Sequence, residues 1–261
     1  MKSFLNQKRP LITPMLSADT EDGLLEEIKN SIEQGADAFC FMMENLPIEL
    51  RTREKVEKFI YAMQDKPVYV SCYKRNDRVC EDDDGRAEYL LLALECGATI
   101  ADIRGDMFCP TPGELTEDAA AIDKQKKLID KIHSMGKEAL MSTHLIFGDE
   151  FHFITKERAV EIASAHKERG ADISKIVTCA DTQEQLWECF ETITFLKKAV
   201  DIPTVFLSSG KYALRHRMGC GLIYEPIVFV KEKHYAVKNT PQMPIEDMVD
   251  IFKKAGMTDE E

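Results

Sequence analysis

Short apolar runs recur along the whole chain, and this repeat constrains the fold more than any other feature of the sequence. The runs are rich in residues that favour β-strands, and most intervals between them have the apolar spacing of an amphipathic helix, as in residues 21–34. The chain is therefore expected to alternate strand and helix. The eight predicted strands are residues 10–16, 38–44, 67–73, 99–105, 138–144, 173–179, 203–209 and 226–230.

The predicted strands are apolar throughout rather than alternating, which is typical of parallel strands covered on both faces. Glycine-alanine pairs precede several of them, in QGADAF, CGATIA and RGADIS, and fit helix ends that take the left-handed conformation. Eight such units in 261 residues match an α/β fold of the single (β/α)8 TIM barrel type. A doubly wound open sheet is the alternative, but no GxGxxG loop follows the first strand. No linker divides the sequence, so residues 1–261 are predicted to form a single barrel domain.

Composition excludes several classes of function. Asp and Glu total 46 against 34 for Lys and Arg, and the net charge of −12 disfavours nucleic acid and anionic membranes as partners. No apolar run approaches the roughly 20 residues that span a bilayer, and no signal peptide is recognisable, so we expect a soluble cytoplasmic protein. The eight cysteines form no Cys-x-x-Cys pair, and no metal site is predicted. The acidic residues 81–85 lack calcium-loop spacing and are interpreted as the start of a helix.

Lys175 is the strongest candidate for a catalytic residue. In a (β/α)8 barrel the active site lies at the carboxyl ends of the strands, and Lys175 lies within the apolar strand 173–179. Burial lowers the pKa of a lysine and leaves a neutral amine that attacks a carbonyl to form a Schiff base. The alternative is a lysine whose stem packs while its head group reaches water. The other polar residues in or just after the predicted strands include Glu44, Tyr73, Asn76, Arg104, Asp106, His144 and Arg217.

His144 ends the predicted strand that precedes the one with Lys175, so both side chains are expected at the same rim. A histidine beside a lysine suits proton transfer during imine formation and at the carbon next to the imine. The alternative is a hydrogen-bonded rim histidine with no catalytic role. A metal role is disfavoured because the nearby Glu150 and His152 do not form an HExxH motif.

These residues lie in segments that resemble the type I 3-dehydroquinate dehydratases, a family of (β/α)8 Schiff-base enzymes. The resemblance is carried by MSTH (141–144), ADISKIV (171–177), SSGKYALRHR (208–217) and NTPQMPIEDM (239–248). It implies that Lys175 forms the imine and that His144 is the general acid and base. It further implies that Arg217 holds the substrate carboxylate and that Gln242 helps to close the site. The imine mechanism requires no metal or organic cofactor, and the resemblance implies a homodimer.

The first half of the chain departs from the family pattern where the family binds substrate hydroxyl groups. Cys40 and Met42 occupy the places of a glutamate and an arginine in the second strand, and Tyr73 occupies that of an arginine in the third. An unpaired hydroxyl in a buried site costs several kcal/mol, enough to change substrate preference. The resemblance therefore implies a divergent member with altered specificity. The residues that would supply a different recognition set are Glu44, Tyr73, Asn76, Arg104 and Asp106.

The function predicted from the sequence is that of a lyase that eliminates water from a carboxylate-bearing cyclic ketone through an imine on Lys175. Its partner is a small-molecule keto acid. Two alternatives stay open: carbon-carbon cleavage by a class I aldolase, which also proceeds through a lysine imine, and a non-catalytic binding protein that retains the fold.

Overall fold

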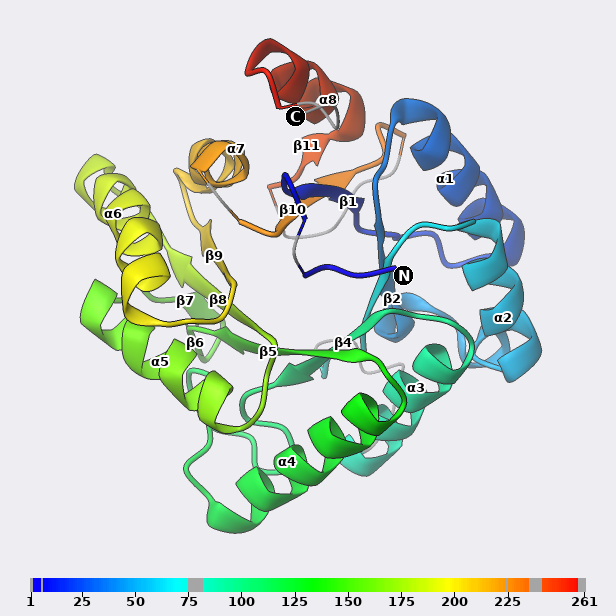
Figure 1. Ribbon diagram of the computed structural model, residues 1–261, viewed down its shortest axis with the longest axis horizontal. Helices are drawn as coiled ribbons and strands as arrows, with labels where there is room; N and C mark the ends of the chain where they lie inside the picture. Colours follow the sequence, from blue (N-terminus) through cyan, green and yellow to red (C-terminus); the bar gives the residue numbers. More distant parts are fainter. Residues whose placement is uncertain (1, 6, 75–81, 224, 235–240, 258–261) are drawn as a thin grey trace. The chain divides into compact units, whose positions relative to one another are not determined.

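The computed structural model describes residues 2–5, 7–74, 82–223, 225–234 and 241–257 (Figure 1). The chain divides into two compact units, each described here by itself. The first unit comprises Met1–Asp102 and Ile227–Glu261, and the second comprises Ile103–Pro226. The assignment of residues 1–261 to a single domain stays a prediction.

The first unit is built on parallel strands. Strand β2 pairs with β3 and β3 with β4, while β1 pairs with β10 and β10 with the short β11. Its elements are β1 (Leu11–Pro14), α1 (Glu21–Gln34), β2 (Phe39–Met42), α2 (Arg53–Ala62), β3 (Val68–Ser71), α3 (Asp83–Glu95), the first three residues of β4 (Ile100–Arg104), β10 (Ile227–Lys231), β11 (Met243–Pro244) and α8 (Ile245–Lys254), with 3-10 turns at Met43–Asn45 and Ile48–Leu50.

The second unit continues the alternation of strand and helix. Strands β5, β8 and β9 pair in parallel in that order, and β6 and β7 form a small antiparallel pair. Helices α5, α6 and α7 lie along these strands (Figure 1). The elements are α4 (Ala119–Ser134), β5 (Glu138–His144), β6 (Ile146–Phe147), β7 (Glu150–Phe151), α5 (Lys156–Glu168), β8 (Ile173–Cys179), α6 (Gln183–Ala199), β9 (Thr204–Ser209) and α7 (Ala213–Ile223).

All eight predicted strands are present, and the helix predicted over residues 21–34 has those bounds. The predicted α/β fold with parallel strands is therefore confirmed. The acidic segment does start a helix, because the Asp82 side chain accepts the backbone N–H of Gly85 at the beginning of α3. The two-residue strands β6, β7 and β11 were not predicted, since elements this short have no periodic signal. None of the helices formed by the described residues has the length and hydropathy that a bilayer crossing requires.

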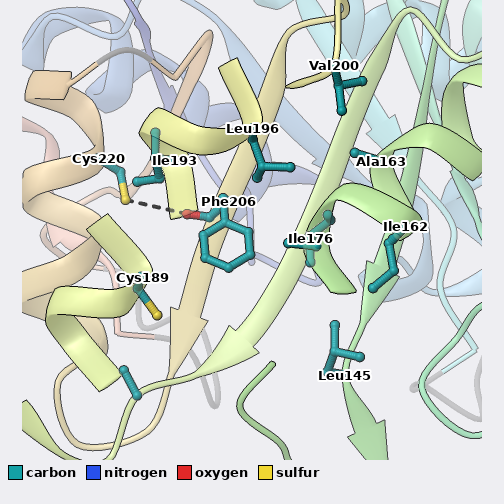
Figure 2. Packing of buried hydrophobic residues seen from close by; sticks show 12 residues of the cluster. Leu145, Ile162, Ala163, Ile176, Cys189, Ile193, Leu196, Val200, Phe206 and Cys220 are labelled. Atoms are coloured by element: carbon teal, nitrogen blue, oxygen red, sulfur yellow. Dashed lines mark hydrogen bonds between the residues drawn. The ribbon is translucent and has the colours of Figure 1, made fainter. Parts of the chain in front are cut away.

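The core of the second unit fixes the direction of the strand side chains. Ile176 of β8 and Phe206 of β9 pack against Ile162, Leu196 and Cys220 from α5, α6 and α7 (Figure 2). The thiol of Cys220 also donates a hydrogen bond to the carbonyl oxygen of Phe206 at 3.5 Å. Successive side chains of a strand point to opposite faces. The odd-numbered residues of β8 therefore point away from the helices.

The long loop between β4 and α4 is held by buried hydrogen bonds. The backbone N–H of Gly105 donates to the carbonyl oxygen of Ser142 in β5 at 2.7 Å. The buried guanidinium of Arg169 donates to the carbonyl oxygens of Gly105 at 2.8 Å and Thr116 at 2.6 Å, and Gln125 donates to that of Gly105 at 3.1 Å. These bonds give the loop a defined path, because its backbone groups are paired rather than exchanging with water.

We expect Gly105→Ala to destabilise this loop. A Cβ at position 105 would lie 2.6 Å from the carbonyl oxygen of Glu114 and 2.7 Å from Oγ1 of Thr143, so backbone has to shift. The free energy of unfolding, measured in urea, should fall by about 2–3 kcal/mol. Gly136→Ala is the control, because a Cβ there meets nothing within 4 Å, and its positive φ costs only about 1 kcal/mol. Equal losses in the two variants would contradict the prediction.

Candidate active site

Lys175 lies in the middle strand of the β5, β8 and β9 group. Its register partners are Ser142 in β5 and Val205 in β9, and only 6% of the residue is exposed. Its side chain extends from the face opposite the α5 and α6 core, because Ile176 occupies the helix-facing position next to it. Lys175 as a whole residue is therefore buried within its strand.

His144 is the last residue of β5 and pairs in register with Val177 of β8. Because Val177 is two residues beyond Lys175, His144 and Lys175 share one face of two adjacent strands. Nδ1 of His144 lies 2.6 Å from Oε2 of Glu114, and the same oxygen accepts the backbone N–H of His144 at 3.1 Å. A carboxylate only accepts hydrogen bonds, so Nδ1 is the donor, and Nε2 is the proton-accepting nitrogen of the neutral ring.

Glu114, which the sequence did not single out, becomes a candidate site residue through its contacts with His144. It lies in the loop after β4, where Gly113 and Glu114 have φ of 76° and 49°. Its carbonyl oxygen accepts a hydrogen bond from Oγ1 of Thr143 at 3.0 Å, and its N–H donates to the carbonyl oxygen of Thr111 at 3.1 Å. The available signal was an acidic residue directly after a Pro-x-Pro-Gly turn in the longest loop of this unit.

Arg217 supplies a buried positive charge from α7. Its Nε donates to the carbonyl oxygen of Ser208 in β9 at 2.9 Å. Burial lowers the pKa of Arg217 to about 10, so the guanidinium remains charged at neutral pH. The adjacent His216 is fully buried, and burial together with the charge of Arg217 lowers its pKa to about 3. His216 is therefore neutral and does not compete for an anion.

Arg104, at the end of β4, forms a buried ion pair with Asp106. Nε of Arg104 lies 2.8 Å from Oδ1 of Asp106, and Oδ2 of the same carboxylate accepts the N–H of Thr111 at 3.1 Å. Both of these residues were predicted at the rim from their positions at a strand end. The pair connects the β4 end to the loop that carries Glu114.

In the first unit, five side chains that lie within β3 and β4 or just after β2 and β3 form a hydrogen-bonded group, which we call the phenol–carboxylate cluster. Its members are Glu44, Tyr69, Ser71, Tyr73 and Asp102. Oγ of Ser71 donates to the two carboxylate oxygens of Glu44 at 3.0 and 3.1 Å, and the hydroxyls of Tyr69 and Tyr73 both donate to Oδ2 of Asp102. Burial, assisted by the charge of Asp102, raises the pKa of Glu44 to about 7.

The remaining predicted site residues also belong to the first unit. Gln242 is buried, and its amide Nε2 lies 3.2 Å from Sδ of Met15. Cys40 and Met42, which replace the family's charged pair, are buried in β2. Asn76 lies outside the described residues. Among the residues that the structure describes, no three or more His, Cys, Asp or Glu side chains are grouped so as to hold a metal ion.

Comparison with known proteins gives one family and a consistent set of folds. The family model described as type I 3-dehydroquinase matches residues 13–259. No curated protein sequence matches the chain.

Solved structures of 3-dehydroquinate dehydratases have the same fold at low sequence identity. The Geobacillus kaustophilus enzyme is similar with a TM-score of 0.79 and 11% identity, covering 99% of this chain and 97% of that one. The type I enzyme of Clostridium difficile, described with covalently modified comenic acid, has a TM-score of 0.75 and 15% identity, covering 95% and 93%. The Enterococcus faecalis enzyme has a TM-score of 0.74 and 14% identity, covering 97% and 98%. The predicted fold class is confirmed by these likenesses.

A buried acid lies close to Arg217 in the second unit and makes the stability of the protein depend on pH. Oε1 of Glu225 accepts the backbone N–H of Phe206 at 2.6 Å. Burial raises the pKa of this carboxyl to about 8, against the opposing effects of that hydrogen bond and of Arg217. Near neutral pH the folded protein therefore keeps a proton on Glu225 that the unfolded chain releases.

We expect Glu225→Gln to remove this pH dependence. In the parent protein the unfolded carboxyl loses its proton near pH 4.5 and the folded one near pH 8, so the contribution to stability is lost as pH rises between these values. Glutamine keeps an acceptor for Phe206 and does not titrate. The free energy of unfolding of the variant relative to the parent should rise by at most about 1.4 kcal/mol per pH unit in this window, measured in urea at pH 5, 6.5 and 8. A difference that is constant across the three pH values would contradict the assignment.

Proposed function

The chain belongs to the type I 3-dehydroquinase family, and from this premise we propose that it is a lyase that captures a ketone as an imine on Lys175 and then eliminates water. The observation that carries the proposal is the pairing of a buried lysine with a histidine on the same face of adjacent strands, the histidine being held by a carboxylate. A buried amine beside an oriented imidazole is the arrangement that imine formation and proton transfer both require.

In the proposed reaction, His144 starts as the imidazolium, with its second proton on Nε2. The neutral amine of Lys175 attacks the ketone carbon, and a proton moves from the new ammonium to the former carbonyl oxygen. The carbinolamine then loses water when Nε2 of His144 gives the departing hydroxyl its proton. The resulting iminium withdraws electrons from the adjacent carbon. Nε2 of His144, now unprotonated, removes a proton from that carbon to give an enamine. The enamine electrons expel the β-hydroxyl, which takes the proton from His144 and leaves as water. A water molecule finally hydrolyses the conjugated iminium, which returns the amine to Lys175 and a proton to Nε2 of His144.

Two further residues support these steps. Glu114 fixes the tautomer and the ring orientation of His144 and stabilises the imidazolium that forms when Nε2 accepts a proton. Arg217 is proposed to hold the substrate carboxylate. Its Nε donates to the carbonyl oxygen of Ser208, which restrains the guanidinium, and a guanidinium can hold a carboxylate through two parallel hydrogen bonds.

The substrate is proposed to be a carboxylate-bearing cyclic ketone that differs from 3-dehydroquinate. The positions where the family has a glutamate and an arginine hold Cys40 and Met42, neither of which replaces their charged hydrogen bonds. The proposed recognition residues are Glu44, Tyr73, Arg104 and Gln242, together with Asn76. The covalently modified comenic acid described for the Clostridium difficile enzyme supports covalent capture of a small acid by this fold.

We expect borohydride reduction to trap the imine. Wild-type protein incubated with a panel of cyclic keto acids, including 3-dehydroquinate, should gain the mass of a reduced adduct in intact-protein mass spectrometry. Lys175→Ala should lose the adduct, whereas Lys127→Ala, a change at an exposed lysine of α4, should keep it. Absence of any adduct in wild type would contradict the imine mechanism. Efficient turnover of 3-dehydroquinate would contradict the altered specificity alone.

We expect Glu114→Gln to lower kcat by about 10- to 100-fold for whichever ketone is trapped, with KM changed less than threefold. Glutamine keeps a hydrogen-bond acceptor near Nδ1 of His144 but removes the charge that stabilises the imidazolium. Steady-state kinetics provides the measurement, and Glu117→Gln, an exposed neighbour in the same loop, is the matched control. Equal kcat values in the two variants would show that the carboxylate of Glu114 has no part in proton transfer.

A further inference from the structure

One buried imidazole contacts the residue immediately before each of the two proposed catalytic side chains. His166 lies in α5 and is fully buried. Its Nδ1 is 2.8 Å from Oγ of Ser174, which precedes Lys175, and its Nε2 is 2.9 Å from Oγ1 of Thr143, which precedes His144. A single side chain thus joins β5 and β8 at the level of both catalytic residues.

The directions of these hydrogen bonds follow from the donors available. The Thr143 hydroxyl donates its only proton to the carbonyl oxygen of Glu114 at 3.0 Å, so it accepts a hydrogen bond from His166. Nε2 of His166 therefore has the ring proton, and in the neutral ring Nδ1 accepts from the hydroxyl of Ser174. The resulting chain of donors runs from Ser174 through His166 and Thr143 to the backbone of Glu114.

This chain ends on the residue whose carboxylate holds His144. Glu114 accepts from Thr143 through its carbonyl oxygen and from Nδ1 of His144 through its side chain. His166 is therefore connected to both parts of the proposed machinery: to Lys175 through the adjacent Ser174, and to His144 through the adjacent Thr143 and through Glu114.

We propose, on the basis of the function proposed above, that His166 is a positioning residue that sets the placement of Lys175 relative to the His144 and Glu114 pair. It contacts Thr143 and Ser174 on the helix-facing side of the strands, whereas Lys175 and His144 extend from the opposite side. It therefore acts through the backbone of the two strands and not on the reacting atoms.

The residues around His166 indicate that its polar nitrogens have a role beyond filling space in the core. Apart from Thr143 and Ser174, the layer between α5 and the strands is rich in apolar residues, among them Ile162 and Ala163 of α5 and Ile176 of β8. An imidazole among such residues is costly unless both nitrogens have partners, and a fully paired group selects one arrangement of the strands over slipped or rotated ones. An apolar side chain of the same size would fill the space but would not define that arrangement.

The test compares His166→Leu and Ser174→Ala with wild type and with His133→Leu. His133 is half-exposed in α4 and its Nε2 lies 2.9 Å from the carboxylate of Asp172 just before β8, so it controls for loss of a histidine contact near the start of that strand. The readout is competitive labelling of lysines by acetic anhydride at pH 8, quantified per lysine by peptide mass spectrometry. It requires neither substrate nor turnover. Near-ultraviolet circular dichroism checks that each variant is folded.

We expect the labelling rate of Lys175, relative to the exposed lysines, to rise at least threefold in His166→Leu, because the amine is no longer held in its buried position. Ser174→Ala, which removes one end of the chain of hydrogen bonds, should give a smaller rise, and His133→Leu should match wild type. The NMR titration midpoint of His144 should move by at least 0.3 pH unit in His166→Leu and in Ser174→Ala. It should stay at the wild-type value in His133→Leu.

Unchanged labelling of Lys175 and an unchanged His144 titration in folded His166→Leu would overturn the proposal and leave His166 as a packing residue. If His166→Leu does not fold, the same result in Ser174→Ala would overturn it. A failure of the proposed function has a different signature: wild type would give no borohydride adduct, while the labelling of Lys175 would still respond to His166.

Discussion

The structure depends on the separation of two faces along strands β5 and β8. On one face, apolar side chains such as Ile176 pack against α5 and α6, and on the other extend Lys175 and His144. Because side chains alternate along a strand, the apolar burial that fixes the strands also fixes where the lysine points. A shift of β8 by one residue in register would place the amine of Lys175 among the helices. The core packing that fixes the register therefore also fixes the positions of the candidate catalytic groups.

The orientation of His144 depends in turn on the loop that follows β4. His144 has its partner Glu114 in a loop, and a loop holds a carboxylate in place only if its own backbone is held. Here the loop carbonyls are bound by Arg169 and Gln125, which are buried at the end of α5 and in α4. The orientation of a proposed proton-transfer group thus depends on side chains that are remote in sequence and that touch no substrate.

The sequence predicted the strands because each is a compact apolar run, and it singled out Lys175 because a lysine is unexpected there. It did not predict Glu114, whose place depends on left-handed backbone in a loop without periodicity. It also did not single out His166, because a histidine among apolar residues in a helix resembles an ordinary core residue. Its two hydroxyl partners are adjacent only through the register of β5 and β8, and one sequence does not show that register. Tyr73 was predicted as a rim residue, but its partner Asp102 was hidden inside an apolar strand.

The phenol–carboxylate cluster bears on specificity through its protonation. Burial, with a smaller effect of the charge of Asp102, raises the pKa of Glu44 to about 7, so near neutral pH a large share of the molecules hold a proton on Glu44. A protonated carboxyl donates a hydrogen bond from a neutral group, and the two phenols, whose protons go to Asp102, can only accept, whereas an arginine offers a fixed positive fork that selects anions and paired acceptors. Replacement of the arginine by these neutral groups lowers the preference for a ligand that needs a charged hydrogen-bonding partner. Within the function proposed above, this difference in hydrogen bonding supports the altered specificity.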